Sequence, residues 1–285
     1  MIQSMTGYGK ALVQLPSKKI TVEIKSLNSK NLDLNGRIPS AYREKELELR
    51  NIISKSLTRG KVDFNLYIEI TGEETYSEVN EVVVKQYMKQ LAKVADGDPV
   101  ELLKMAMRLP DALKTERDEI DENEYKTILQ AFNNALESIN TYRTDEGTVL
   151  EKDMTERSQN IRSLLDQVME IDPQRVDSLK ERLRKAVSDL KEAVDENRFE
   201  QELIYYLEKY DITEEKVRLK NHLDYFQETI ESNDSNGKKL AFISQEIGRE
   251  INTIGSKANY APMQQLVVQM KDELEKIKEQ SLNIL

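Results

Sequence analysis

The single histidine of this chain lies in a stripe of polar residues that recurs at helical spacing. Glu215, Arg218, His222 and Tyr225 follow one another at intervals of three, four and three residues, so one face of a helix presents all four side chains. A lone histidine is more often a structural residue than a functional one. Its charged neighbours indicate a chemical site here, because carboxylate, guanidinium and imidazole groups would lie together.

Two other helical segments are expected to carry polar stripes of the same kind. One stripe consists of Arg198, Glu202 and Tyr205, and the other of Glu246, Arg249, Glu250, Thr253 and Lys257. If the three helices pack through their apolar stripes, Glu202, His222, Glu246 and Glu250 converge on one pocket. Carboxylates with an imidazole suit Mg²⁺ or Mn²⁺. The alternative is an ordinary solvated surface, since amphipathic helices routinely carry flanking Glu and Arg.

A divalent cation at such a pocket would lower the pKa of a bound water and neutralise the developing charge of a phosphodiester. Arg218, Arg249 or Lys257 would then hold the phosphate. The predicted chemistry is hydrolysis of a nucleic-acid backbone. The sequence has no glycine-rich phosphate loop before a helix, no Gly-x-Ser-x-Gly elbow and no cysteine, which excludes thiolate nucleophiles, disulfides and cysteine-bound zinc.

The elements that position these residues begin with a small α/β unit. Residues 2–15 and the alternating run 20–24 predict a β-hairpin, and a third extended segment follows at residues 32–34. Ser40 is expected to cap a helix, and residues 62–70 alternate as a further strand. Residues 1–72 are therefore predicted to form a β-β-β-α-β domain.

Downstream of this domain the apolar residues repeat with helical period. Pro173 is expected to mark the turn of an extended antiparallel helical hairpin. Near-heptad spacing in the last third predicts a helical bundle, its final helix disturbed at Gly255 and Pro262. The predicted helices lie near residues 78–94, 98–107, 122–141, 198–210, 213–231 and from 238 onward. The expected fold class is α+β, with a helical connector over 73–146, the hairpin over 147–196 and a C-terminal helical domain over 197–285.

Charge is distributed unevenly along the chain. The net charge is −10, yet residues 1–72 contain twelve Lys and Arg against seven Asp and Glu. This asymmetry suggests that a polyanion meets the N-terminal part, although a merely solvated charged surface explains the charge equally well. The sequence has no apolar run long enough to span a membrane and no secretory signal pattern. We therefore expect a cytoplasmic protein without a membrane partner.

Several segments, taken in order, are similar to a known family. They are SMTGYGK, SLNSKNLDLNGRIP, LTRGKVDF, YRTDEGTVLEKDM, EEKVRLKNHLDYF and KLAFISQEIGREINTIGSKAN. Together they resemble the YicC/YloC family of bacterial endoribonucleases, with weaker likeness over residues 73–135 and in the predicted hairpin. Two departures are visible: Lys30 stands where arginine is common, and Ile247-Gly248 stands where Met-Asn is common. A lysine at this position supplies charge without a bidentate fork.

The resemblance implies a divalent-metal-dependent endonuclease that acts on single-stranded or loop RNA as a homohexamer, with no DNA substrate expected. It also implies that the N-terminal domain takes part in RNA capture and ring assembly. The residues carried over as RNA-binding are Asn28, Lys30, Arg37, Arg59 and Lys61, beside Arg218 and Lys257 of the C-terminal stripes. The catalytic candidates are His222, Glu246, Arg249 and Glu250, and the metal-ligand candidates are Glu202, His222, Glu246 and Glu250.

Two other functions compete with this one. A non-catalytic helical RNA-binding adaptor would explain the acidic charge, the long hairpin and the missing standard motifs, but it would not need Glu, His and Arg clustered beside a core. A metal-independent ribonuclease would use His222 as general base and Arg249 to stabilise the phosphorane. The two enzymes and the adaptor differ in their response to removal of divalent metal.

Overall fold

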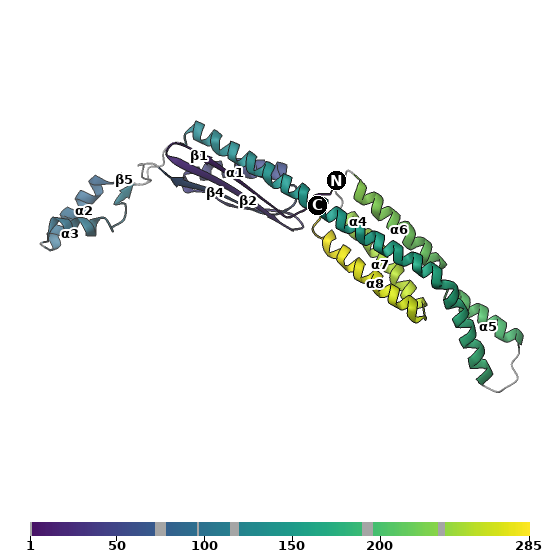
Figure 1. The fold of residues 1–285 in the computed structure, drawn as a ribbon. Helices are drawn as coiled ribbons and strands as arrows, with labels where there is room; N and C mark the ends of the chain where they lie inside the picture. Colours follow the sequence, from purple (N-terminus) through teal and green to yellow (C-terminus); the bar gives the residue numbers. More distant parts are fainter. Residues whose placement is uncertain (1, 72–77, 96, 115–119, 190–195, 233–236) are drawn as a thin grey trace. The chain divides into compact units, whose positions relative to one another are not determined.

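A computed structural model describes residues 2–71, 78–95, 97–114, 120–189, 196–232 and 237–285. The chain divides into two compact units (Figure 1). One comprises Tyr8–Lys25 and Leu32–Ile139, and the other comprises the segment up to Gly7, Ser26–Asn31 and Asn140–Leu285. The first unit holds a β-sheet and the second is helical, which confirms the α+β fold class.

The N-terminal sheet has four strands in the order β1-β2-β4-β3, and β3 runs parallel to β4. A 3-10 helix, η1, and helix α1 form the crossover between these two parallel strands. The elements are β1 (Gly7–Gln14), β2 (Lys18–Leu27), β3 (Leu32–Arg37), η1 (Ser40–Lys45), α1 (Glu46–Ser56) and β4 (Gly60–Ile70). The predicted β-β-β-α-β order is confirmed. The predicted cap is wrong, because Ser40 is the first residue of η1 and Pro39 takes the cap position.

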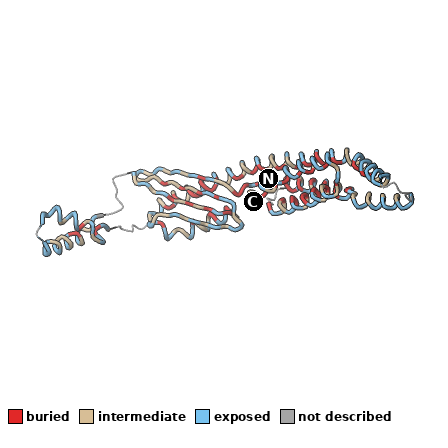
Figure 2. The backbone as a smooth tube through the Cα atoms, turned by 90° about the horizontal axis from the view of Figure 1, so that it is seen from below, coloured by how far each residue is buried: buried red, intermediate tan, exposed pale blue. Residues whose placement is uncertain are grey.

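One face of this sheet is buried under α1 and the start of helix α4 (Glu122–Asp189). Strand alternation directs the apolar residues of β2 and β4 to this face, where Phe64 packs edge-on against Phe132 with ring centroids 6.0 Å apart. Gly9 of β1 passes so close to α4 that an added Cβ would lie 2.1 Å from the Ala135 carbonyl oxygen. The buried segments appear red in Figure 2.

A small lobe follows β4 in the chain. It comprises β5 (Glu78–Val79), α2 (Glu81–Val94), α3 (Pro99–Ala106) and β6 (Leu113–Lys114), and β5 pairs antiparallel with β6. Asn80 Oδ1 accepts a hydrogen bond from Val83 N, and Asp98 Oδ1 accepts one from Val100 N, so both helices begin at side-chain caps. The helices expected near residues 78–94 and 98–107 are therefore present.

Helix α4 is longer than expected. It includes the predicted helix near residues 122–141 and continues through Pro173 to Asp189, so the predicted turn at Pro173 is wrong. Asp172 accepts a hydrogen bond within the helix from Arg175 Nε at 2.7 Å, and one from Lys216 Nζ, distant in sequence, at 2.6 Å. Buried Arg175 also donates to the Tyr210 carbonyl. These tertiary bonds offset the hydrogen bond that a proline removes.

The helical unit is a bundle of α4, α6 (Thr213–Glu231), α7 (Gly237–Lys257) and α8 (Ala261–Ser281), and its described segments share one apolar core. The single final helix expected from residue 238 is wrong, because the chain reverses between Lys257 and Ala261. Pro262 lies in the first turn of α8, where a proline costs no hydrogen bond. Among the described helices, none has the length and apolarity that a membrane crossing requires.

Candidate active site

Helices α6 and α7 pack antiparallel and bring their two polar stripes together. Two contacts fix the pairing: Lys257 Nζ lies 2.8 Å from Glu215 Oε1, and Lys239 Nζ lies 4.6 Å from the centre of the Tyr225 ring. Leu219, Leu223 and Phe226 of α6 are buried beneath the polar residues, as are the isoleucines of α7. The resulting polar surface, here called the charged seam, consists of Glu215, Arg218, His222, Glu246, Arg249, Glu250 and Lys257.

Glu250 is the central carboxylate of the charged seam. It is only 8% exposed and faces α6 from α7. Burial raises the pKa of Glu250, and the negative charge of Glu215 adds to the increase, whereas the positive charges of Arg218 and His222 oppose it. A buried carboxylate that is under the influence of a guanidinium and an imidazole can hold a proton or a cation, which is the chemistry expected of a hydrolytic site.

Glu215 is a second buried carboxylate that the sequence stripe contained but that was not assigned a role. It is 6% exposed, and its Oε1 pairs with Lys257, whose Nζ also donates to the Asp211 carbonyl. In the described part of the chain, Oε2 of Glu215 is buried without a hydrogen-bond partner. Such an atom is costly unless it has a ligand. The helical spacing to His222 was the sequence signal that could have identified it.

The two arginines of the seam are exposed to solvent, whereas the side chain of Glu246 is largely buried. Arg249 is exposed and pairs with Glu246 one turn earlier, with Nη1 2.8 Å from Oε1. Arg218 is likewise exposed and pairs with Glu214 at 2.5 Å. Because exposed i,i+3 and i,i+4 pairs are weak, both guanidinium groups can exchange their carboxylate partners for a phosphate.

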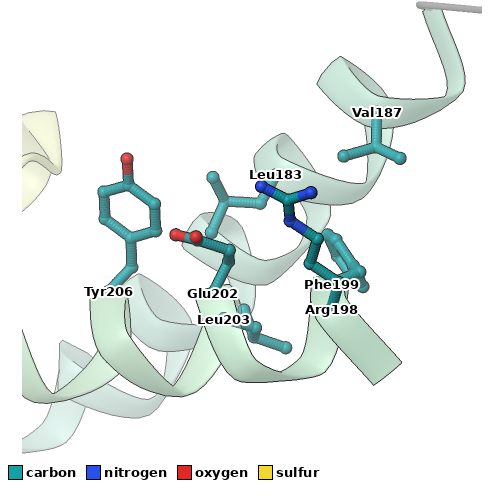
Figure 3. Close-up of a pocket in the computed structure, with 7 residues that line it drawn as sticks. All are labelled: Leu183, Val187, Arg198, Phe199, Glu202, Leu203 and Tyr206. Carbon is teal, nitrogen blue, oxygen red and sulfur yellow. The ribbon is translucent and has the colours of Figure 1, made fainter. Parts of the chain in front are cut away.

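Glu202 does not join this site. It lies on α5 (Glu196–Lys209) and lines a separate, mainly apolar pocket against the C-terminal end of α4, with Leu183, Val187, Phe199, Leu203 and Tyr206 (Figure 3). The expected convergence of Glu202 with His222, Glu246 and Glu250 is therefore wrong. Helix α5 packs against the end of α4, a partner that exists only because α4 continues past Pro173.

Over the described ranges, no group of three or more His, Asp or Glu is arranged to hold a metal ion. Within the seam, the charges of Glu215 and His222 act on the buried carboxyl group of Glu250.

The predicted RNA-binding residues fall into both compact units. Arg37 and Lys61 are exposed on the same open face of the sheet, because Asp33 pairs with Lys61 and Arg37 pairs with Asn65 in the β3–β4 register. Arg59 precedes β4 and is half-buried, and Lys30 is exposed. Asn28 instead donates to the Leu282 carbonyl at 2.5 Å, and Lys257 is engaged inside the seam, so both have structural contacts.

Comparisons with known proteins agree over the whole chain. The family described as "Endoribonuclease YicC-like, N-terminal region" matches residues 2–152, and "Endoribonuclease YicC-like, C-terminal" matches residues 168–285. The chain is 34% identical to a probable endoribonuclease YicC of Clostridioides difficile and 29% identical to one of Haemophilus influenzae. Both alignments cover 100% of this chain and 100% of the relative. The chain therefore belongs to the YicC-like endoribonuclease family.

Proposed function

We propose that this protein is a divalent-metal-dependent endoribonuclease that hydrolyses single-stranded or loop RNA, with its reaction centre at the charged seam. Endoribonuclease function is supported by the family match and by the names of both relatives. The observation that carries the location is buried Glu250, which faces Glu215, Arg218 and His222 between α6 and α7. An adaptor without catalysis would have no need for two buried carboxylates there.

The carboxylate donors at the seam suit Mg²⁺ or Mn²⁺ better than they suit a metal ion whose ligands are all supplied by the protein. Mg²⁺ keeps several waters and is commonly bound through one or two carboxylates together with substrate phosphates. Glu250 and the unpartnered Oε2 of Glu215 would supply those carboxylate oxygens. When bound, the cation would lower the pKa of a water and neutralise charge on the phosphodiester.

The other residues of the seam have separable roles in this proposal. Lys257 holds Oε1 of Glu215 and thereby leaves Oε2 available to a ligand. The exposed guanidinium groups of Arg218 and Arg249 bind the phosphate that is to be cleaved, since arginine can donate two parallel hydrogen bonds to it. The charge of His222 acts on Glu250, and in this proposal its imidazole binds the phosphate or moves a proton to or from the reacting oxygens.

A cleavage assay with purified protein and a short end-labelled RNA tests the metal requirement. We expect internal cuts with Mg²⁺ or Mn²⁺, loss of cleavage with EDTA, and recovery when metal is added back. Equal cleavage with EDTA would support a metal-independent reaction that uses His222. Binding of the RNA without cleavage under every metal condition would support the adaptor.

Substitution of the buried carboxylates tests the location of the site. Glu250→Gln and Glu215→Gln keep side-chain size but remove the charge, so each is expected to lower kcat by at least about 100-fold. Equilibrium dialysis should show weaker Mn²⁺ binding by both variants. The matched control is Glu228→Gln, on the exposed side of α6. Full activity in both seam variants would exclude this location.

The homohexamer expected from the family resemblance is part of the proposal. Mass photometry of the purified protein should give six copies of the 33.0 kDa chain. If a site is completed by a second copy, specific activity should fall as the protein is diluted below its assembly range. A monomer with unchanged specific activity would contradict this part of the proposal.

A further inference from the structure

Two aromatic side chains lie exposed at one end of the α6–α7 contact. Tyr225 is 45% exposed on α6, and Phe242 is 61% exposed on α7. Neighbouring large residues on the same turns, Phe226 and Ile243, are almost completely buried. The rings of Tyr225 and Phe242 therefore lie outside the apolar core in which Phe226 and Ile243 are buried. This exposure is unusual, because burial of an aromatic ring is strongly favourable.

Helical spacing places both rings beside the charged seam. Tyr225 follows His222 by three residues, and Phe242 precedes Glu246 by four, so each ring shares a face with a seam residue. The contact of Lys239 with the Tyr225 ring shows that this end of α7 meets the same end of α6. Along the helix axis, Phe242 is about 12 Å from Glu250, a distance of about three to four stacked nucleotides.

We propose that Tyr225 and Phe242 form a base-stacking subsite that binds unpaired nucleobases of the RNA next to the cleavage centre. The inference rests on the proposed function, because RNA is the ligand. Aromatic faces beside lysine and arginine are the chemistry that binds single strands: bases stack on the rings and phosphates contact the cations. Lys239 supplies one cation at the rings, and Arg218 and Arg249 supply two more along the seam.

This subsite accounts for a preference for unpaired RNA. A base within a duplex has both faces covered by its neighbours, so only an unpaired base can stack on a protein ring. A hairpin loop or a single strand would therefore be bound, whereas a continuous duplex would contact only the cations.

The first test separates base stacking from phosphate binding. Tyr225→Leu and Phe242→Leu are made in a Glu250→Gln background and titrated with a fluorescein-labelled 12-nucleotide oligoadenylate and an abasic strand of equal length. We expect affinity for oligoadenylate to fall by about 5-fold to 100-fold for each substitution and affinity for the abasic strand to stay within about 2-fold. Tyr142→Leu, an exposed aromatic on α4, is the control with no expected loss. Equal losses on both strands, or no loss on either, would overturn the proposal.

The second test uses the absence of tryptophan from the chain. Phe242→Trp, again with Glu250→Gln, introduces the only indole, whose emission a stacked base quenches. Oligoadenylate should quench the emission and the abasic strand should not. If RNA leaves the emission unchanged while protein concentration alone shifts it, the rings contact a second copy of the chain and the proposal is wrong.

Both tests measure binding with a variant that need not cleave, so they are independent of catalysis. If Glu250→Gln proves fully active while oligoadenylate still quenches the introduced indole, the catalytic assignment fails and the stacking subsite stands. If Glu250→Gln is inactive and neither aromatic substitution affects oligoadenylate binding, the catalytic assignment stands and the subsite fails.

Discussion

Gly147, inside helix α4, should be a position where the usual effect of a glycine-to-alanine substitution is reversed. Alanine in an exposed helix interior stabilises by about 1 kcal/mol relative to glycine. A Cβ at Gly147, however, would lie 2.0 Å from the Ile2 carbonyl oxygen and 2.8 Å from its carbonyl carbon. Both contacts are with backbone, which cannot rotate away.

The segment that would have to move is held on both sides. Ser4 N donates to the Arg143 carbonyl at 3.0 Å, and Leu285 N donates to the Gln3 carbonyl at 3.0 Å. Displacement of this segment loses two backbone hydrogen bonds of about 1 kcal/mol each, and overpacking adds roughly 1 to 3 kcal/mol. After the helix gain of about 1 kcal/mol is subtracted, Gly147→Ala should destabilise the helical unit by about 2 to 4 kcal/mol.

Gly248→Ala is the matched control, since this glycine is also inside a helix and also buried. Its Cβ would meet Leu274 Cδ2 at 3.2 Å and Lys278 Nζ at 3.7 Å, both at the ends of flexible side chains. We expect this variant to match the wild type or gain up to about 1 kcal/mol. Urea unfolding followed by far-ultraviolet circular dichroism measures both. Gly147→Ala with a midpoint equal to or above that of Gly248→Ala would refute the reasoning.

Three further predictions concern the charges. Replacing Arg37, Arg59 and Lys61 by Gln should weaken RNA binding. The slope of log affinity against log salt concentration should become shallower by up to about 2, because each phosphate contact contributes roughly 0.7. An unchanged slope in anisotropy titrations would exclude these three residues from the RNA-binding surface. His222→Ala should lower cleavage, and excess Mn²⁺ should partly restore it if the imidazole is a ligand; no rescue would point to phosphate contact instead. Lys257→Met should lower the free energy of unfolding by roughly 1 to 3 kcal/mol, because the Glu215 carboxylate is then buried without a partner; the figure is reduced for the partial exposure of Lys257. Adding Glu215→Gln should recover most of that loss. If the two substitutions instead have additive effects on the free energy of unfolding, the pair is not coupled.

Local patterns were sufficient for the elements whose burial follows their own sequence. Strand β4 alternates apolar and polar residues because one face of the sheet is buried, and helices α2 and α3 begin at the capping residues Asn80 and Asp98. In such segments the structure favoured by the local sequence is the one that tertiary packing also stabilises, so the sequence pattern predicts the element.

The errors arose where contacts distant in sequence decide the outcome. Pro173 resembles a helix end until Arg175 is seen to donate to the Tyr210 carbonyl, 35 residues away. That error also misplaced Glu202, because α5 packs against a part of α4 that was expected to be a separate hairpin helix. At the seam, the helical spacing of His222 and Glu250 fixes the helix faces on which they lie, whereas the unpartnered oxygen of Glu215 depends on three-dimensional packing.

The two ends of the chain are joined by backbone hydrogen bonds. Met5 N donates to the Asn283 carbonyl, Leu285 N donates to the Gln3 carbonyl, and Ser4 and Ile284 form a β-bridge. These partners are far apart in sequence, so at ordinary elongation rates they are synthesised tens of seconds apart. The sheet-bearing unit is complete once Ile139 has emerged, but the helical unit must wait for Asn283 to Leu285. Ile2 and Met5, which are buried in the helical unit, therefore reach their final packing only after Asn283 to Leu285 have been synthesised.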